Sequence, residues 1–170
     1  MNNLFLTGPV GIGKSTILQN ILKEINLSIG GYITNRVYEE HYKKFVAKSL
    51  VDDLEHYTII KVDTKKNLMK VFKESFETGL IQILDKSIKH TDLIILDELG
   101  TAENDINIFT SKVFEILDSE KIVLGVLKDF NCDFLSNIRK RNDVIIIRIT
   151  EENRDHILDK VLDIIKGFIN

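Results

Sequence analysis

Residues 4–16 read LFLTGPVGIGKST, and this stretch is the clearest indication of how the chain folds. The apolar residues before Gly8 predict a short strand over 3–7. Between that strand and a following helix the chain fits the pattern G-x-x-x-x-G-K-S/T, from Gly8 to Ser15. From Lys14 onward apolar residues recur at helical spacing, at Ile17, Leu18, Ile21, Leu22 and Ile25. A strand, a glycine-rich turn and an amphipathic helix in this order predict a loop that binds phosphate groups.

The residue types in this loop suit a phosphate chain. Backbone N–H groups approach phosphate oxygens closely where no Cβ intervenes, and a helix N-terminus adds unpaired N–H groups. Lys14 supplies a flexible cation for the β- and γ-phosphates, and the Ser15 hydroxyl is a ligand for Mg²⁺. The alternative, a plain turn between a strand and a helix, is disfavoured by the match to the full pattern. The expected nucleotide contacts in this stretch are Gly8, Pro9, Val10, Gly11, Ile12, Gly13, Lys14, Ser15 and Thr16.

A second stretch, LIILDELG at 93–100, places two acidic residues at the end of an apolar strand. Asp97 is expected to hold Mg²⁺ together with Ser15, usually through water. Glu98 follows directly and is a candidate general base that orients water for attack on the γ-phosphorus. Asp97, Glu98 and Gly100 complete the expected nucleotide-binding residues. The alternative interpretation is that both acids only begin a loop and cap a turn.

The rest of the chain alternates between strand and helix patterns. Four β-branched or aromatic runs are expected to form an antiparallel set, at 30–38, 45–51, 57–63 and 67–72. Apolar runs at 92–97, 121–127 and 144–149 predict parallel strands. The strand at 92–97 is expected to be covered on both faces. Helices are expected near 75–89, 105–118 and 133–140, and Thr150 is placed to cap a final helix. This order predicts a doubly wound α/β sheet, and nothing divides residues 1–170 into separate domains.

Composition narrows the functional classes. The chain has 170 residues, 44% of them hydrophobic, which is typical of one globular domain with a full core. No apolar run reaches the length of a membrane helix and the first residues lack a basic leader, so we expect a cytoplasmic protein. Cys132 is the only cysteine, which fits a reducing compartment, and the four histidines show no metal-binding spacing. The formal net charge of −3 makes nucleic acid an unexpected partner, and no protein partner is predicted.

Eight segments, in order, resemble the small P-loop nucleoside-triphosphatases of thermophiles and vertebrates. They are LFLTGPVGIGKST (4–16), GGYIT (30–34), FE (76–77), LIILDELG (93–100), Phe109, IVLGV (122–126), IRKRNDV (138–144) and ITEENRDHIL (149–158). The last two are the more specific, because they are not general P-loop features. The resemblance implies a three-layer sandwich around a RecA-like, mostly parallel sheet with an added antiparallel section. It also implies Mg²⁺-dependent hydrolysis of nucleoside triphosphates, ATP and GTP among them, to the diphosphate and phosphate, with low selectivity among bases.

The chain departs from the family pattern in two places. Where the family has DEIGKMEL, this chain has DELGTAEN, so Thr101 and Ala102 replace a lysine and a methionine, although Glu103 matches. After GGYIT the family usually has EEVR, whereas residues 35–38 here are Asn, Arg, Val and Tyr. The binding and metal positions survive both changes, which bear on substrate contacts and on the turnover rate.

Two arginines in NIRKRND, at 137–143, are further catalytic candidates. Arg139 and Arg141 are of the type that approaches a γ-phosphate and stabilises charge in the transition state. The alternative is that both lie at the solvated end of a short helix, and the resemblance favours the catalytic role. Arg154 is expected to tie the final helix to an acidic neighbour.

Two functions compete with hydrolysis at this point. A small nucleotide or nucleoside kinase shares the chain length and the glycine loop, but the sequence has no long arginine-rich lid segment and no evident acceptor site. A nucleotide-binding switch, in which slow hydrolysis resets a partner-binding state, fits the altered residues 101 and 102. Nucleoside-triphosphate hydrolysis, with Lys14 and Glu98 in the central roles, is the favoured hypothesis.

Overall fold

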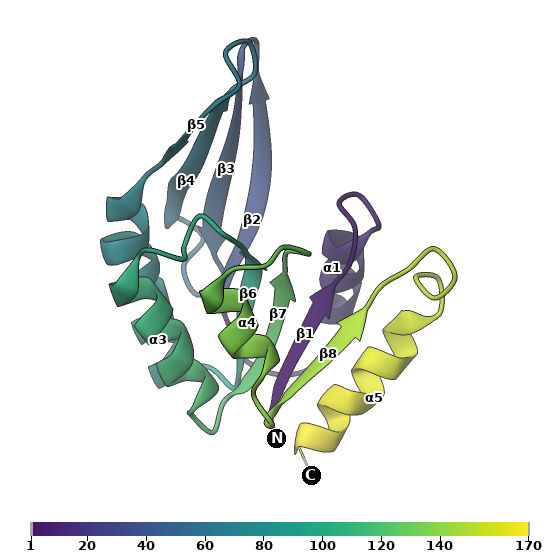
Figure 1. Ribbon diagram of the computed structural model, residues 1–170. Helices are drawn as coiled ribbons and strands as arrows, with labels where there is room; N and C mark the ends of the chain where they lie inside the picture. The colour runs from purple at the N-terminus through teal and green to yellow at the C-terminus, as the bar shows by residue number, and fades with distance from the viewer. Residues whose placement is uncertain (1, 170) are drawn as a thin grey trace.

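The computed structural model describes residues 2–169, and its strands form one eight-stranded sheet in the order β5-β4-β3-β2-β6-β7-β1-β8 (Figure 1). The strands are β1 (Asn3–Thr7), β2 (Ile29–Glu39), β3 (Tyr42–Ser49), β4 (His56–Asp63), β5 (Leu68–Val71), β6 (Leu93–Leu99), β7 (Ile122–Leu127) and β8 (Val144–Arg148). The helices are α1 (Lys14–Glu24), the π-helical turn η1 (Ser75–Leu80), α2 (Ile81–His90), α3 (Asn107–Leu117), α4 (Asp133–Arg139) and α5 (Ile157–Ile169). The predicted order of strands and helices is confirmed.

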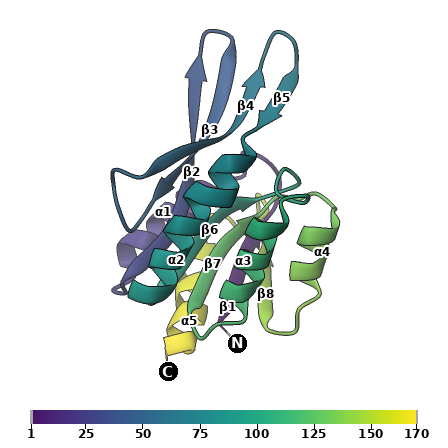
Figure 2. The same cartoon turned by 90° about the vertical axis from the view of Figure 1, so that its left-hand side faces the viewer.

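The parallel half of the sheet lies between two helical layers, seen from the side in Figure 1 and from the α2 and α3 face in Figure 2. β1 pairs in parallel with β7 and β8, and β6 pairs in parallel with β7 and β2. Side chains alternate along β1, so that Leu4 and Leu6 pack in the cluster with α1 and α5, while Phe5 packs with α2, α3 and α4. This is the predicted three-layer sandwich. None of the helices within residues 2–169 has the length and hydrophobicity needed to cross a membrane.

The antiparallel strands extend the sheet beyond the helical layers, as an arm formed by β2 to β5 (Figure 1). The long strand β2 joins the two halves, because Tyr32 pairs with Leu96 of β6 on one side and with Ser49 of β3 on the other. The predicted antiparallel set is therefore confirmed. The pairing of β2 with β6 places residues 33–36 beside the end of β6, the strand that carries Asp97 and Glu98.

The prediction that Thr150 caps the last helix is wrong, because α5 begins only at Ile157. Residues 151–156 form turns instead. The Asn153 side chain closes them: its Oδ1 accepts from the Thr150 N–H at 2.9 Å and its Nδ2 donates to the Arg148 carbonyl at 2.9 Å. An asparagine that satisfies the backbone on both sides competes with helix formation at this point.

Candidate nucleotide site

The glycine loop, residues 8–13, connects β1 to α1 as predicted. Gly8 has a φ of 140° and passes so close to the end of β8 that a Cβ would lie 2.5 Å from the Ile149 carbonyl oxygen. Gly13 precedes α1 with a φ of 107°, and a Cβ there would meet nothing within 4 Å. Glycine is thus needed at Gly8 for packing and at Gly13 for backbone conformation. Pro9 and Val10 are exposed, whereas the buried Ile12 anchors the loop in the cluster with α1 and α5.

The start of α1 has the features of an anion site. Gly13 caps the helix through its backbone, and no side chain within residues 2–169 caps it. Its first N–H groups and its dipole therefore face the loop. The Ser15 and Thr16 side chains lie on the exposed face of this first turn.

Lys14 bends back over the loop. Its Nζ donates to the Gly8 carbonyl at 2.7 Å and to the Pro9 carbonyl at 2.7 Å. Burial lowers the pKa of the Lys14 ammonium, and the nearby Glu98 carboxylate acts in the opposite direction. Two neutral carbonyls are weak partners for an ammonium compared with phosphate oxygens, so a polyphosphate on the loop would compete for Lys14.

The acidic pair lies at a β-bulge in β6. The pairing of β6 with β7 runs Leu96 to Gly125 and then Leu99 to Leu127, so β6 carries one extra residue between these pairs. Glu98 has a φ of 60°, which is unusual for a residue other than glycine. Strained backbone of this kind is often found at functional sites, where a bulge re-aims a side chain. The sequence predicts a strand that ends at Asp97, but the strand continues through the bulge to Leu99.

Asp97 is buried and only partly satisfied. Its Oδ2 accepts from the Thr34 N–H at 2.8 Å, whereas its Oδ1 is buried and has no hydrogen-bond partner within residues 2–169. Burial raises the pKa of Asp97 to about 6. An unpartnered carboxylate oxygen fits a hard divalent cation. No group of three or more His, Cys, Asp or Glu side chains within these residues forms a metal site, so a cation here would also need phosphate oxygens and the Ser15 hydroxyl.

Glu98 faces a pocket that it shares with the glycine loop, named here the Glu98 pocket. Its side chain is 10% exposed and accepts a hydrogen bond from Arg36 at 2.7 Å. The Lys128 Nζ lies 3.9 Å from its other oxygen. Lining this pocket are Gly8, Pro9, Val10, Lys14, Arg36, Glu98, Val126, Lys128, Asp129 and Phe130. The structure therefore brings Lys14 and Glu98 together, as the sequence predicted.

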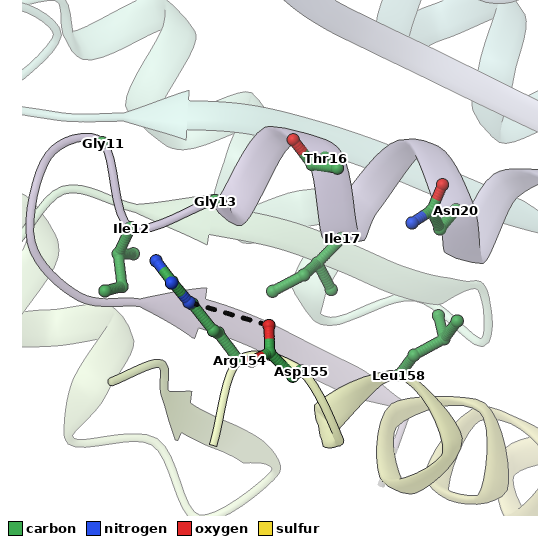
Figure 3. Close-up of a pocket in the computed structure, with 9 residues that line it drawn as sticks. All are labelled: Gly11, Ile12, Gly13, Thr16, Ile17, Asn20, Arg154, Asp155 and Leu158. Carbon is green, nitrogen blue, oxygen red and sulfur yellow. Dashed lines mark ion pairs between the residues drawn. The ribbon is translucent and has the colours of Figure 1, made fainter. Parts of the chain in front are cut away.

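A second pocket lies on another side of the loop, beside α5, and is named here the Arg154 pocket (Figure 3). Its walls are Gly11, Ile12, Gly13, Thr16, Ile17, Asn20, Arg154, Asp155 and Leu158. The Arg154 Nε lies 3.7 Å from the carboxylate of Asp155, the next residue in the chain. Both residues precede α5, so this ion pair does not tie the final helix to an acidic neighbour as the sequence predicts. A molecule bound to the loop thus has space on two sides of it.

Gly100 does not offer its N–H to this site. The group donates to Glu103 Oε2 at 2.9 Å, and both residues are buried. The sequence predicts a nucleotide contact from Gly100, but its single N–H donor is already used to hold the chain after the bulge. Burial raises the pKa of Glu103.

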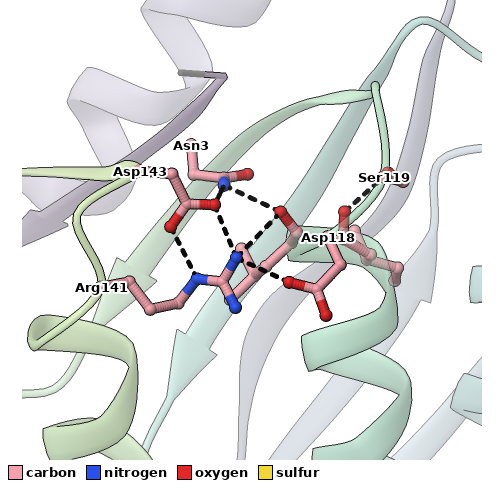
Figure 4. A network of polar contacts seen from close by, with 7 residues as sticks. Asn3, Asp118, Ser119, Arg141 and Asp143 are labelled. Atoms are coloured by element: carbon pink, nitrogen blue, oxygen red, sulfur yellow. Dashed lines mark hydrogen bonds and ion pairs between the residues drawn. The ribbon is translucent and has the colours of Figure 1, made fainter.

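The two arginines of residues 137–143 occupy different places. Arg139 donates to the carbonyls of Lys128, at 2.8 Å, and Phe130, at 2.9 Å, so it supports the loop behind the Glu98 pocket without lining it. Arg141 instead bonds to Asp143 and Asp118 (Figure 4). Asn3, the first residue of β1, joins this network through Asp143. The glycine loop follows the last residue of β1, so Arg141 lies at the opposite end of the parallel strands, and its geometry does not support the predicted catalytic role.

No sequence motif gives Thr34, Arg36 or Lys128 a role in this site, although Arg36 falls in the stretch 35–38 that departs from the family pattern. Lys128 directly follows β7, and the rule that selected Asp97, a polar residue at the carboxyl end of a parallel strand, would have found it. Thr34 and Arg36 carry no such signal, because their place depends on the pairing of β2 with β6.

A family model described as NTPase matches residues 3–162. The chain belongs to this family. Nucleoside-triphosphatase THEP1 from Thermotoga sp. (strain RQ2) is 30% identical to it over 168 residues, which cover 96% of this chain and 95% of the relative. Nucleoside-triphosphatase THEP1 from Methanocaldococcus jannaschii is 28% identical over 167 residues, with 94% and 95% covered. The resemblance predicted from the motifs is thus confirmed.

The fold of this NTPase family member also matches a solved structure. The crystal structure of THEP1 from Aquifex aeolicus superposes with a TM-score of 0.79, covering 96% of this chain and 99% of that one. At 23% sequence identity this likeness supports the fold alone. It agrees with the predicted P-loop α/β sandwich and its antiparallel section.

Proposed function

We propose that this NTPase hydrolyses nucleoside 5′-triphosphates, ATP and GTP among them, to the diphosphate and phosphate with Mg²⁺ as cofactor. The observation that carries the proposal is the shared pocket of Lys14 and Glu98, which sets a candidate base opposite a phosphate-binding loop. The names of the relatives, which are nucleoside-triphosphatases, point to the same chemistry. Because Cys132 is a free cysteine, we further propose a reducing, cytoplasmic location.

The loop and the start of α1 would hold the phosphate chain through backbone N–H groups. Lys14 would exchange the carbonyls of Gly8 and Pro9 for oxygens of the β- and γ-phosphates. Ser15 and the free oxygen of Asp97 would hold Mg²⁺, which supplies charge neutralisation at the phosphates. Thr34 fixes the Asp97 carboxylate in place through its N–H.

The chemical step is an in-line displacement by water. The water oxygen forms a bond to the γ-phosphorus while the bond from that phosphorus to the βγ-bridging oxygen breaks. Glu98 orients the water and takes one of its protons, which later leaves with phosphate, and the electron pair of the broken bond stays on the diphosphate. Lys14 stabilises the negative charge that develops on the oxygens.

The Arg154 pocket would receive the nucleoside. With the terminal phosphate beside Glu98, the other end of the chain has to leave the loop on another side, where Ile12, Ile17 and Leu158 offer an apolar wall. Apolar walls hold a base without reading its hydrogen-bonding edge, which agrees with the low base selectivity that the resemblance implies.

Phosphate release tests this function directly. Purified protein is incubated with ATP, GTP, CTP or UTP, with and without Mg²⁺, and free phosphate is measured. We expect phosphate from several of the triphosphates, and only with Mg²⁺. Transfer of phosphate to an added nucleoside monophosphate would overturn hydrolysis in favour of a kinase, and slow turnover that rises on adding a protein partner would favour a switch.

Cation binding is expected to weaken in acid because of Asp97. Its carboxyl group has to be ionised to hold Mg²⁺, and its pKa of about 6 in the folded protein lies above the ordinary 3.8. Apparent Mg²⁺ affinity should therefore fall by about tenfold per pH unit below pH 6. Titrating Mg²⁺ against a nonhydrolysable triphosphate analogue between pH 5 and 8 measures this. Asp97→Asn should bind Mg²⁺ weakly throughout, and an equally steep fall in that variant would contradict the assignment.

A further inference from the structure

Arg36 reaches the Glu98 pocket from the antiparallel arm. It lies on β2 near the pairing of that strand with β6, and its Nη2 donates to Glu98 Oε1 at 2.7 Å. The Arg36 side chain is 35% exposed, whereas the Glu98 side chain is 10% exposed. Arg36 is therefore the more exposed member of this ion pair, and both residues line the pocket.

The pocket holds more positive than negative charge. Lys14, Arg36 and Lys128 are its cations, and Glu98 and Asp129 are its carboxylates. Asp129 is already neutralised, because Arg148 binds both of its oxygens, at 3.0 and 2.7 Å. The Arg36 guanidinium and the Lys128 ammonium also lie over the same Phe45 ring, 5.9 and 5.4 Å from its centroid. A half-buried group of cations with one carboxylate between them favours a polyanion as the occupant.

In this arrangement neither oxygen of Glu98 is both exposed and unpaired. Arg36 occupies Oε1, and Oε2 is buried without a hydrogen bond, facing Lys128. A general base has to accept a hydrogen bond from the water that it orients. Loosening the contact with Arg36 would therefore make Oε1 fully available to such a water.

We propose that Arg36 detects the terminal phosphate of a bound triphosphate, restraining Glu98 in the nucleotide-free protein and releasing it when its guanidinium binds γ-phosphate oxygens. The inference rests on the proposed function of the same site. A phosphate group carries more charge and more acceptor oxygens than one carboxylate, so it competes well for the planar fork of an arginine. A diphosphate lacks the group that reaches Arg36 and leaves the Arg36–Glu98 pair intact.

The Arg36→Met variant tests the proposal, because the proposal predicts a larger loss of affinity for a triphosphate than for a diphosphate. Affinities for a nonhydrolysable triphosphate analogue and for the diphosphate are measured by calorimetry in the presence of Mg²⁺. We expect the variant to bind the triphosphate analogue about tenfold more weakly, and the diphosphate within about twofold of wild type. We also expect kcat to fall by roughly a hundredfold or more, because a guanidinium that binds the γ-phosphate oxygens also stabilises the charge that develops on them in the transition state.

Two further variants keep the result interpretable. Lys44→Met removes a cation from the same arm, where Lys44 pairs with Glu39, and it should change neither affinity nor kcat. Arg36→Lys keeps the charge without the fork, and we expect it to recover part of the selectivity for triphosphate over diphosphate. If circular dichroism shows that Arg36→Met is unfolded, Arg36→Lys is used in its place.

An equal loss of affinity for both nucleotides in the Arg36 variants would overturn the proposal, and so would no loss for either. These outcomes are separable from the proposed function. If the wild-type protein releases no phosphate, hydrolysis is wrong, yet the ratio of triphosphate to diphosphate affinity still decides the role of Arg36. If the wild type hydrolyses triphosphates and Arg36→Met does so equally well, only the role of Arg36 is wrong.

Discussion

Glu98→Gln is expected to lower kcat by about a hundredfold or more while binding of nucleoside triphosphate persists. The amide keeps the size of the side chain and an oxygen that accepts from Arg36, so the bulge and the pocket should be preserved. It cannot take a proton from water, which is the step that we assign to this residue. Loss of the chemical step without loss of binding is the result that separates a base from a structural carboxylate.

Single-turnover hydrolysis, with enzyme in excess over a radiolabelled triphosphate, measures this step without a contribution from product release. Glu55→Gln is a matched control, because Glu55 is also a largely buried partner of a cation, Lys86, at 2.6 Å, and lines neither loop pocket. It should hydrolyse at the wild-type rate. Unchanged single-turnover hydrolysis by Glu98→Gln would remove Glu98 from the reaction and leave its left-handed backbone without a catalytic explanation.

The parts of the site that could be predicted from sequence are those whose geometry is local. The loop from Gly8 to Ser15 lies between a strand and the helix that follows it, and the chain itself fixes that order. Asp97 was found by a similarly short-range rule, since an acidic residue that ends an apolar strand lies at the carboxyl edge of the sheet. Both predictions depend only on where a strand ends or a helix begins, within a few residues of the position predicted.

The remaining parts depend on pairing between segments far apart in the chain. Arg36 meets Glu98 because β2 pairs with β6 in the register that sets Tyr32 opposite Leu96, and no short pattern encodes that register. The bulge at Glu98 likewise arises from the pairing of β6 with β7. Arg141 shows that closeness in sequence can also mislead. It is only two residues from Arg139, but it lies beyond the end of α4, where Asp118 and Asp143 hold it at the end of the sheet opposite the glycine loop. Charge and proximity in sequence do not say which edge of a sheet a side chain reaches.

Lys14→Ala is expected to weaken both triphosphate affinity and turnover, in contrast to Glu98→Gln. The ammonium is assigned to the β- and γ-phosphates in the ground state and in the transition state, so its loss should cost roughly 10- to 100-fold in affinity and a further hundredfold or so in kcat. In the free protein the same group joins the Gly8 and Pro9 carbonyls, so the variant also loses two hydrogen bonds that hold the loop closed.

The effects of Lys14 on phosphate and on the loop can be told apart. If the lysine acts only by holding the loop, Lys14→Ala should bind diphosphate and triphosphate more weakly by the same factor and keep a kcat near that of wild type. Direct contact with the β- and γ-phosphates instead requires that kcat falls as well, because the charge on the transferred group increases in the transition state. Lys23→Ala, in the exposed last turn of the same helix, provides the control for loss of a cation from α1. A Lys14→Ala variant with wild-type kcat at saturating nucleotide would place the lysine in loop structure alone.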